Sequence, residues 1–313
     1  MHTTDYTIMS RRSSSVYDGL HERLASCYSL WYTIQKGGSG MRIVGIHYTR
    51  WASQAEADIA SLVQKAKHLQ YDQLEVDGII LQQMSPWGRK RLGFEARNYR
   101  IDISYSLNPP PDYDLSSLDE DVRRHALTQF QNLIRTIGEM GGGSLNGPLY
   151  SSFPVQPHLI QDKQRLLEQS IKSLRSLTPL AQDEDVMLNI RPVNRYEHFL
   201  IPTASEALAY VHAINHPNCG IDLDTFEMNL EEDDMKAAIL QAGIFLHCLH
   251  IRENNKKMVG LGALDWKTVR NALDEIYYKG PLVHMPDIGD SGQEEPAESQ
   301  RIRNLLCGEV API

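Results

Sequence analysis

The stretch that decides the fold runs from Met187 to Glu253 and contains N-I-R-P-V-N-R-Y-E (189–197), I-D-L-D-T-F-E-M-N-L-E-E-D (221–233) and L-H-C-L-H-I-R-E (246–253). Each segment is a short apolar run that ends in charged or imidazole side chains. This is typical of a buried parallel strand whose carboxyl end opens into an active site. The ends carry Arg191, Asp224 and His250, spaced about 25 to 35 residues apart, which fits one strand–helix unit per step. A barrel would bring these ends together around one mouth.

Strands and helices alternate outward from this stretch in both directions. Short apolar runs predict further strands over 42–47, 73–76, 101–105, 144–149 and 282–286. Apolar positions at helical spacing predict helices over 55–69, 117–137, 163–177, 203–214 and 265–277, and the capping sequences S-L-D-E (117–120) and T-A-S-E (203–206) begin two of them. The alternation predicts a parallel (β/α)8 TIM barrel, with an open doubly wound sheet as the alternative. No glycine-rich phosphate-binding motif follows a strand, so nothing indicates a nucleotide site.

The composition is that of an ordinary globular protein, with 42% hydrophobic and 23% charged residues. A net charge of -9 and a pI near 5.7 argue against nucleic acid as a partner. No apolar run approaches the ~20 residues that span a bilayer, which argues against a membrane partner. The cysteines, at positions 27, 219, 248 and 307, are scattered and form no C-x-x-C, which indicates free thiols in a reducing cytoplasm.

The first 40 residues differ from the rest of the chain. They contain R-R-S-S-S (11–15), a short amphipathic stretch around Leu20, Leu24 and Trp31, and the linker-like G-G-S-G (37–40). Acidic residues and the lack of an apolar core argue against a targeting peptide. We interpret residues 1–40 as an N-terminal extension, either flexible or the product of a mis-set start codon or a cloning remnant. Residues 41–313 would then form one barrel, a fold that usually takes ~250 residues.

Several motifs in the same order resemble the D-tagatose/D-psicose (ketose) 3-epimerase family, within the xylose-isomerase-like (β/α)8 barrels. The most specific are N-R-Y-E (194–197), L-D-T-F-x-M-N-x-E-E-D (223–233) and H-x-x-E-N-N (250–255), and weaker support comes from L-E-V (74–76), L-S-S-L-D-E (115–120) and G-x-G…W (260–266). The resemblance covers roughly residues 41–290. It implies a sugar substrate and one divalent cation, manganese or cobalt, held by two glutamates, an aspartate and a histidine. The two glutamates would also move the proton at C3 of the ketose, beside oxygens that the cation polarises.

The resemblance carries over only half of that metal site. By position, Asp224 and His250 match the aspartate and the histidine, whereas Arg191 and Met285 stand where the family has its two glutamates. Arginine offers no lone pair, and methionine is a soft, weak ligand for a hard cation. We expect Arg191 to take the place of the cation by pairing with Asp224. The protein should therefore hold little or no divalent metal.

Neighbouring polar residues have other interpretations. Asp222 is expected to be structural, and His247 should lie on the face of its strand opposite His250. His284 should point away from the barrel axis, unless a one-residue shift in register turns it inward as a third ligand. The acidic run 231–234 is interpreted as the solvated start of a helix.

The resemblance also suggests where a substrate and its catalytic groups would lie. Glu197 matches a substrate-contacting glutamate, Glu227 stands in place of a family histidine, and Lys256 replaces an arginine, with loss of the bidentate geometry. A rebuilt catalytic set would be drawn from Glu197, Glu227, Glu253, His250 and Arg191. Sugar contacts are expected from Glu197, Glu253, Lys256 and the aromatic side chains Tyr48, Trp51 and Phe153, although the three aromatic side chains could alternatively only line the mouth.

Two functions remain open from the sequence. The first is an isomerase or epimerase that acts on a small sugar, sugar acid or polyol at the carboxyl-terminal mouth of the barrel. The alternative is a non-catalytic barrel, descended from an epimerase, that binds a sugar or a partner protein. A lyase with the same enediolate chemistry is a third hypothesis, and a homo-oligomer is compatible with each of them.

Overall fold

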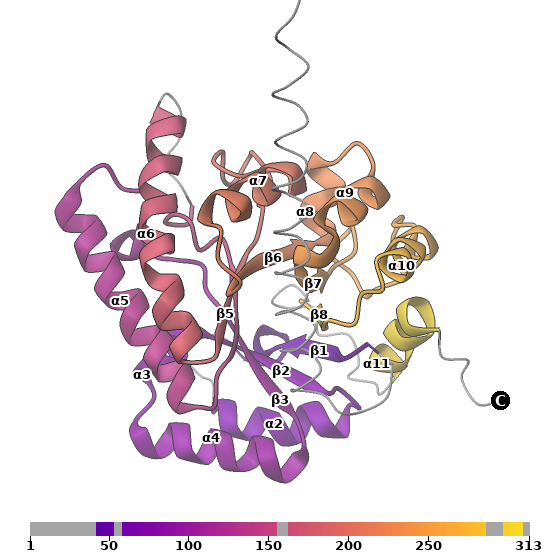
Figure 1. Ribbon diagram of the computed structural model, residues 1–313. Helices are drawn as coiled ribbons and strands as arrows, with labels where there is room; N and C mark the ends of the chain where they lie inside the picture. The colour runs from indigo at the N-terminus through magenta and orange to yellow at the C-terminus, as the bar shows by residue number, and fades with distance from the viewer. Residues whose placement is uncertain (1–41, 53–57, 155–161, 286–296, 309–313) are drawn as a thin grey trace, which may run out of the picture. The chain divides into compact units, whose positions relative to one another are not determined.

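The computed structural model describes residues 42–52, 58–154, 162–285 and 297–308. Within them, parallel strands close into a barrel in chain order, and β8 pairs with β1 (Figure 1). The strands are β1 (Val44–His47), β2 (Gln73–Asp77), β3 (Asp102–Ser106), β4 (Gly143–Gly147), β5 (Val186–Ile190), β6 (Cys219–Asp224), β7 (Leu246–Ile251) and β8 (Leu282–His284). The predicted TIM barrel is confirmed, and the open sheet is wrong.

Helices surround the barrel on its outer side (Figure 1). They are α2 (Ile59–His68), α3 (Gly78–Gln83), α4 (Pro86–Tyr99), α5 (Glu120–Glu139), α6 (Lys163–Asp183), α7 (Ala204–Ile214), α8 (Thr225–Glu231), α9 (Met235–Ala242), α10 (Trp266–Glu275) and α11 (Ala297–Ile302). No helix of the described segments combines the length and the apolar character that crossing a membrane requires. The predicted extension, residues 1–40, lies outside the described residues.

The predicted helices are found, but their starts and their number needed correction. Thr203 caps α7 as predicted, because its hydroxyl accepts from the Glu206 N–H at 3.2 Å. Helix α5 instead starts at Glu120, and Asp119 rather than Ser117 caps it. Helices α3 and α4 were not predicted at all. The helical pattern of α4 is weak because only Leu92 and Ala96 are buried along it.

The prediction that the acidic run 231–234 is a solvated helix start holds only for its second half, because Asp233 and Asp234 are exposed and directly precede α9. Glu231 is the last residue of α8 and its carboxylate accepts from the Arg195 backbone N–H at 2.7 Å and from its guanidinium. The Glu232 carboxylate accepts from the Ala204 N–H at 2.6 Å. Asp234 caps α9. Glu231 and Glu232 therefore tie the end of α8 to the loop before α7 and to the first residue of α7.

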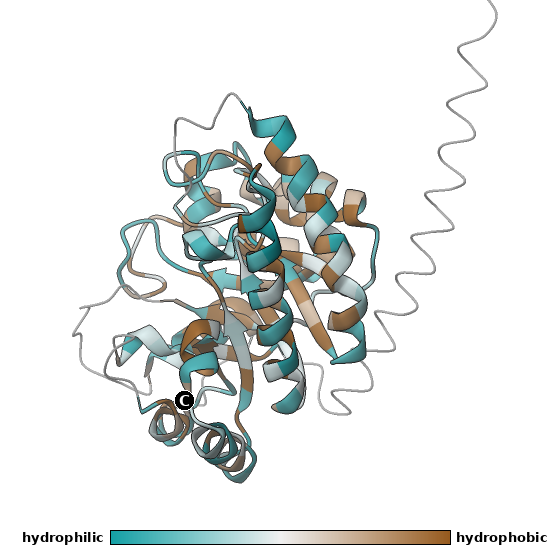
Figure 2. Cartoon of the chain, turned by 90° about the vertical axis from the view of Figure 1, so that its left-hand side faces the viewer, coloured by the Kyte–Doolittle hydropathy of each residue, from teal (hydrophilic) through white to brown (hydrophobic). Residues whose placement is uncertain are grey.

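The strands are buried on both faces, and the two faces differ in chemistry. Apolar side chains on one face of each strand join those of the helices in one hydrophobic core, and the helices are hydrophilic on their outer sides (Figure 2). The other face carries polar side chains toward the barrel axis, among them Glu75, Asn146, Asn189, Asp222 and His250, each fully buried. An isolated buried charge is very costly, so this inner face must satisfy its own hydrogen bonds and charges.

Candidate active site

A hydrogen-bonded layer crosses the barrel axis at the level of Glu75. The Glu75 Oε2 atom accepts from His250 Nε2 at 2.7 Å, and its Oε1 accepts from Asn146 Nδ2 at 2.7 Å. Asn146 in turn accepts at Oδ1 from Asn189 Nδ2 at 2.8 Å. Parallel pairing places Asn146 beside Asn189, so neighbouring strands deliver these groups to one layer. The carboxylate of Glu75 is thereby fully used within the protein.

Arg191 completes this layer through Asp222. Its Nε donates to Asp222 Oδ2 at 2.7 Å, and its Nη2 lies 2.6 Å from the same oxygen. The other Asp222 oxygen accepts from His250 Nδ1 at 2.6 Å. The guanidinium also lies against the imidazole of His250, with Nη2 2.9 and 3.0 Å from the two ring nitrogens. We call Glu75, Asp222, Arg191 and His250 the inner cluster.

The charges of the inner cluster hold one another in place. Burial and the charge of Arg191 would lower the pKa of His250, but the carboxylates of Asp222 and Glu75 outweigh them and hold it well above its usual value. Burial would raise the pKa of Glu75, but the charged and hydrogen-bonded His250 brings it down to about 2. His250 is therefore an imidazolium, and both of its nitrogens donate.

The predicted pair of Arg191 with Asp224 is wrong. Ile190 at the end of β5 pairs with Ile221 of β6, so the following residue, Arg191, is level with Asp222. Asp222, which was expected to be merely structural, is the direct ion-pair partner of Arg191 and His250. The motif alone could not show this, because both aspartates lie on the same face of their strand.

Asp224 belongs to a second cluster at the mouth, formed with Arg252 and Glu227. Arg252 Nε donates to Asp224 Oδ1 at 3.1 Å, and Nη2 lies 2.9 Å from Oδ2 in an ion pair. The same Nη2 donates to Glu227 Oε1 at 2.6 Å. Glu227 Oε2 accepts from the backbone N–H and the side-chain amide of Asn194, at 2.9 and 2.7 Å. We call Asp224, Arg252 and Glu227 the mouth cluster.

The two carboxylates of the mouth cluster differ in acidity. Burial and the neighbouring charge of Asp224 raise the pKa of Glu227, despite Arg252 and Asn194. Burial would also raise the pKa of Asp224, but the charges of Arg252, Arg191 and His250 lower it. Asp224 thus stays ionised while the pKa of Glu227 is raised, and a pair of acids with pKa values pushed apart is the arrangement that acid–base catalysis uses.

Arg252 was missed by the sequence analysis. The signal was present in H-I-R-E (250–253), because residue 252 is two positions after His250 and so faces the same side of the strand. Its guanidinium packs on the ring of Phe226 at 4.8 Å, and the Lys256 ammonium lies over the same ring at 5.0 Å. Lys256 therefore lies at the edge of the mouth cluster.

Two of the predicted acids do not join either cluster. Glu253 is buried, and its Oε1 accepts from Trp266 Nε1 at 2.6 Å and from the Gly260 N–H at 2.9 Å, so it fixes the loop before α10. Glu197 is exposed in the turn after Asn194. Its predicted part in proton transfer therefore stays a prediction, from a position outside both clusters.

The predicted aromatic contacts lie at different depths. Tyr48 is buried in the hydrophobic core, which argues against its predicted contact with a sugar. The inward-facing residue is its neighbour His47, whose Nε2 is 3.0 Å from Ser106 Oγ and 4.0 Å from Glu75. Burial, opposed by Glu75, lowers the pKa of His47 to about 4, so it is neutral. Trp51 and Phe153 are half-buried.

The other histidines and Met285 also have clear positions. His284 is buried with Nδ1 3.5 Å from Glu298 of α11, so it points outward as predicted and is no third ligand. Half-buried Met285 follows β8. The prediction for His247 is wrong, because Ile221 pairs with Leu246 and Asp222 with Cys248, leaving His247 as an extra residue in a bulge. Its Nδ1 reaches inward to Asn189 Oδ1 at 3.1 Å.

The described residues hold one potential metal site. Glu75, Cys248 and His250 each bring one potential ligand atom within 4.8 Å of the others. The site fits a divalent cation poorly. Both His250 nitrogens already donate to carboxylates, and burial raises the pKa of the Cys248 thiol to about 12. Asp224, the remaining ligand that the resemblance implied, is occupied by Arg252.

Known proteins share this fold and much of the sequence. A sequence model of the xylose isomerase-like TIM barrel family matches residues 63–304. The chain is 32% identical to a D-psicose 3-epimerase of Ruminiclostridium cellulolyticum over 248 residues, 79% of this chain and 85% of the relative. It is 33% identical to a D-psicose 3-epimerase of Enterocloster bolteae over 258 residues, 81% and 85% of the two chains. A crystal structure of D-psicose 3-epimerase with D-tagatose from Clostridium cellulolyticum superposes with a TM-score of 0.81 at 30% identity, covering 84% of this chain and 99% of that one. The predicted resemblance to ketose 3-epimerases is confirmed.

Proposed function

The chain belongs to the xylose isomerase-like TIM barrel family, and we propose that it is a carbohydrate isomerase or epimerase that works without a divalent metal. Its proposed substrate, at the mouth of the barrel, is a small sugar or sugar acid that carries a carbonyl group, whereas a polyol, which has none, would only be bound. The sugar epimerases among its relatives support the reaction class. The observation that carries the proposal is the mouth cluster, in which Arg252 bridges Asp224 and Glu227.

The absence of a metal is proposed from the charges already present. Arg191 neutralises Asp222, and Arg252 neutralises Asp224, so a guanidinium stands beside each aspartate that would face a cation. A divalent ion would meet these two positive groups and the His250 imidazolium at short range, where repulsion in a poorly solvated site is large. It would also find no free imidazole lone pair.

The mouth cluster contains the groups that the first chemical step needs. Isomerisation and epimerisation both begin when a base removes the proton from the carbon beside a carbonyl group, and the electron pair moves onto the carbonyl oxygen. Glu227, whose raised pKa suits a general base, would take that proton. Arg252, aided by Lys256, would stabilise the enediolate oxygen. Delivery of a proton to the opposite face of the same carbon completes an epimerisation, and delivery to the adjacent carbon, with transfer of the hydroxyl proton, completes an isomerisation.

A non-catalytic, sugar-binding barrel is the competing function. It is favoured by the loss of both proton-transferring glutamates, because Arg191 and Met285 supply no base in their place. The buried free thiols of Cys219 and Cys248 suit the cytoplasmic location that we propose in either case.

Solvent deuterium exchange separates the two functions. Purified, chelator-treated protein would be incubated in D₂O with ketoses, including D-psicose and D-tagatose, and with aldoses and sugar acids, and each sugar followed by NMR. We expect deuterium to enter beside the carbonyl of at least one sugar, and Glu227→Gln to slow this exchange about 10²- to 10⁴-fold. Glu275→Gln, on α10, is the matched control. Sugar binding without exchange would support the non-catalytic function, and exchange only after manganese is added would contradict the metal-free mechanism.

A further inference from the structure

Helix α4 carries large aromatic side chains on a face that does not pack against the barrel. Trp87 and Phe94 are 71% and 59% exposed, whereas Leu92 and Ala96 face the core. The positions Trp87, Lys90, Phe94 and Arg97 follow one another by three, four and three residues, so they form one stripe on the outer side of the helix. Aromatic and cationic side chains alternate along it. Burial against the residues that the structure describes explains neither the aromatic rings nor the pattern.

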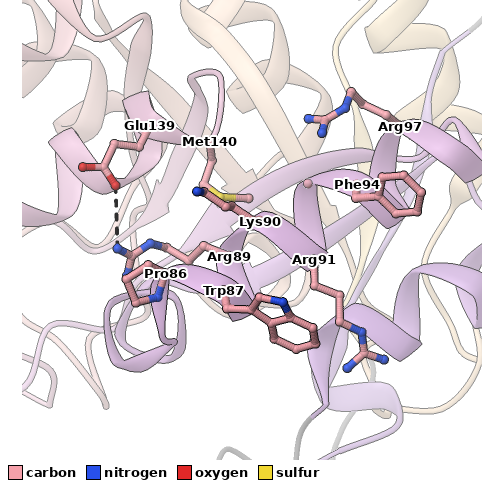
Figure 3. A pocket seen from close by; sticks show the side chains of 10 residues that line it. Pro86, Trp87, Arg89, Lys90, Arg91, Phe94, Arg97, Glu139 and Met140 are labelled. Atoms are coloured by element: carbon pink, nitrogen blue, oxygen red, sulfur yellow. Dashed lines mark ion pairs between the residues drawn. The ribbon is translucent and has the colours of Figure 1, made fainter.

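This stripe borders a groove of ≈ 850 Å³ between α4 and the end of α5 (Figure 3). Gly93 leaves room on the α4 side, and Glu139 and Met140 line the opposite side. Figure 3 shows the Arg89 side chain paired with Glu139, and Phe94 and Arg97 lie at the other end of the hollow. We call this hollow the α4 groove.

The α4 groove is positively charged in an acidic protein. Residues 85–100 contain five basic side chains and one acidic side chain, which gives +4 in a chain of net charge -9. Arg89 is paired with Glu139 and Arg91 with Asp58. Among the residues that the structure describes, Lys90 and Arg97 have no ion pair, and both are exposed. Two unpaired cations therefore lie between and beside two exposed aromatic rings.

We propose that the α4 groove docks an acidic, extended segment of a partner protein. Trp87 and Phe94 are seven residues apart, about 10 Å along the helix. This matches side chains three residues apart on an extended chain in the polyproline II conformation, because three residues complete one turn of that chain and so keep both side chains on one face. Carboxylates between these apolar side chains would meet Lys90 and Arg97. Such charge complementarity selects the partner at close range, because salt screens the -9 charge of the whole chain beyond ~8 Å. A hollow suits a chain better than it suits a flat lipid surface. This inference is independent of the chemistry at the mouth.

A labelled peptide tests the proposal on the full-length protein. An extended peptide of about seven residues spans the ~21 Å length of α4. The probe is a library of fluorescein-labelled heptapeptides with glutamates between two apolar residues placed three positions apart, read by fluorescence anisotropy. The reference library has glutamine in place of glutamate. We expect saturable binding of acidic members only, and binding that weakens as salt rises.

Paired variants identify the surface. Trp87→Ala with Phe94→Ala, and Lys90→Glu with Arg97→Glu, should each weaken binding about tenfold or more, as expected for anchor residues. The control combines Lys172→Glu with Tyr277→Ala, an exposed cation and an exposed aromatic side chain elsewhere. Thermal unfolding checks that each variant is folded.

Three results would overturn the proposal. One is the lack of saturable binding by any acidic member, or binding that the α4 variants leave unchanged. Another is binding only to phosphatidylserine vesicles, which would identify a lipid surface. The third is salt-sensitive self-association that Lys90→Glu with Arg97→Glu abolishes, which would identify a second copy of this chain.

Discussion

The inner cluster and the mouth cluster use the same kinds of side chain for different ends. Each contains a guanidinium beside acids. In the inner cluster, the Arg191 side chain is 6% exposed, and His250 donates one hydrogen bond to each of the two carboxylates. In the mouth cluster, Arg252 is 15% exposed and divides its Nη2 between Asp224 and Glu227. A closed set of charges favours stability and fixed geometry. In the mouth cluster, one guanidinium is shared between two carboxylates, and the pKa of Glu227 is raised, as a group that transfers protons requires.

The largest expected effect is the loss of Arg191. Arg191→Met should destabilise the fold by about 3 to 5 kcal/mol, because it leaves the buried Asp222 carboxylate without its ion-pair partner. Urea unfolding followed by circular dichroism measures this. The control is Arg124→Met, whose exposed guanidinium pairs with the exposed carboxylates of Glu120 and Asp121 and should contribute far less to stability. Equal costs for the two substitutions would contradict the structural role of the inner cluster.

Substitutions in the mouth cluster should lower activity more than they lower stability. Glu227→Gln and Arg252→Met should each lower deuterium exchange or turnover about 10²- to 10⁴-fold, the usual contribution of a general base or an oxyanion donor. The effect of Arg252→Met on unfolding should be smaller than that of Arg191→Met, because the Arg252 side chain is 15% exposed and that of Arg191 is 6% exposed. A variant that loses stability but keeps activity would show that the cluster only supports the loops of the mouth.

The inner cluster should make the stability of the fold depend on pH. The pKa of Glu75 is lowered from 4.5 to about 2 in the folded state, so its contribution is present above pH 4.5 and is lost as the pH falls toward 2. That shift corresponds to about 3 kcal/mol. The pKa of His250 is raised, so its contribution is complete below 6.5 and is lost only as the pH rises through the folded-state value.

Glu75→Gln tests this dependence. The difference in unfolding free energy between the wild type and the variant should narrow by about 3 kcal/mol as the pH falls from 4.5 to 2. Glu139→Gln is the control, because its side chain is 66% exposed. A constant difference over this range would show that Glu75 is not held ionised by His250.

The sequence predicted the barrel and some of the residues of the two clusters, but not how they pair. Strand ends and family motifs placed Arg191, Asp224 and His250 at the mouth, because the carboxyl ends of parallel strands meet there. The register between β5 and β6 places Arg191 beside Asp222, and the bulge between β6 and β7 turns His247 toward the barrel axis. Neither register nor a bulge has a signature in one sequence. Arg252 could have been found from the two-residue period of its strand, whereas the use of Glu253 to fix a loop depends on the tertiary fold.

The smallest expected effect is that of metal on the wild-type protein. Manganese at millimolar concentration and chelator should both leave its melting temperature unchanged, because a ligand stabilises a fold only if it binds the folded state.

The comparison is sharpened by a variant that removes both guanidiniums and supplies both carboxylates: Arg191→Glu, Arg252→Gly and Met285→Glu. Freed of Arg252, Asp224 would become available beside the new acids. This variant should gain a melting shift that rises with manganese concentration, and the single substitutions should not, since ligands that act as one set are strongly non-additive. Calorimetric titration gives the stoichiometry. Stoichiometric manganese on the wild-type protein would mean that the guanidiniums do not take the cation's place. If the triple variant folds but takes up no metal, these side chains do not converge on one site.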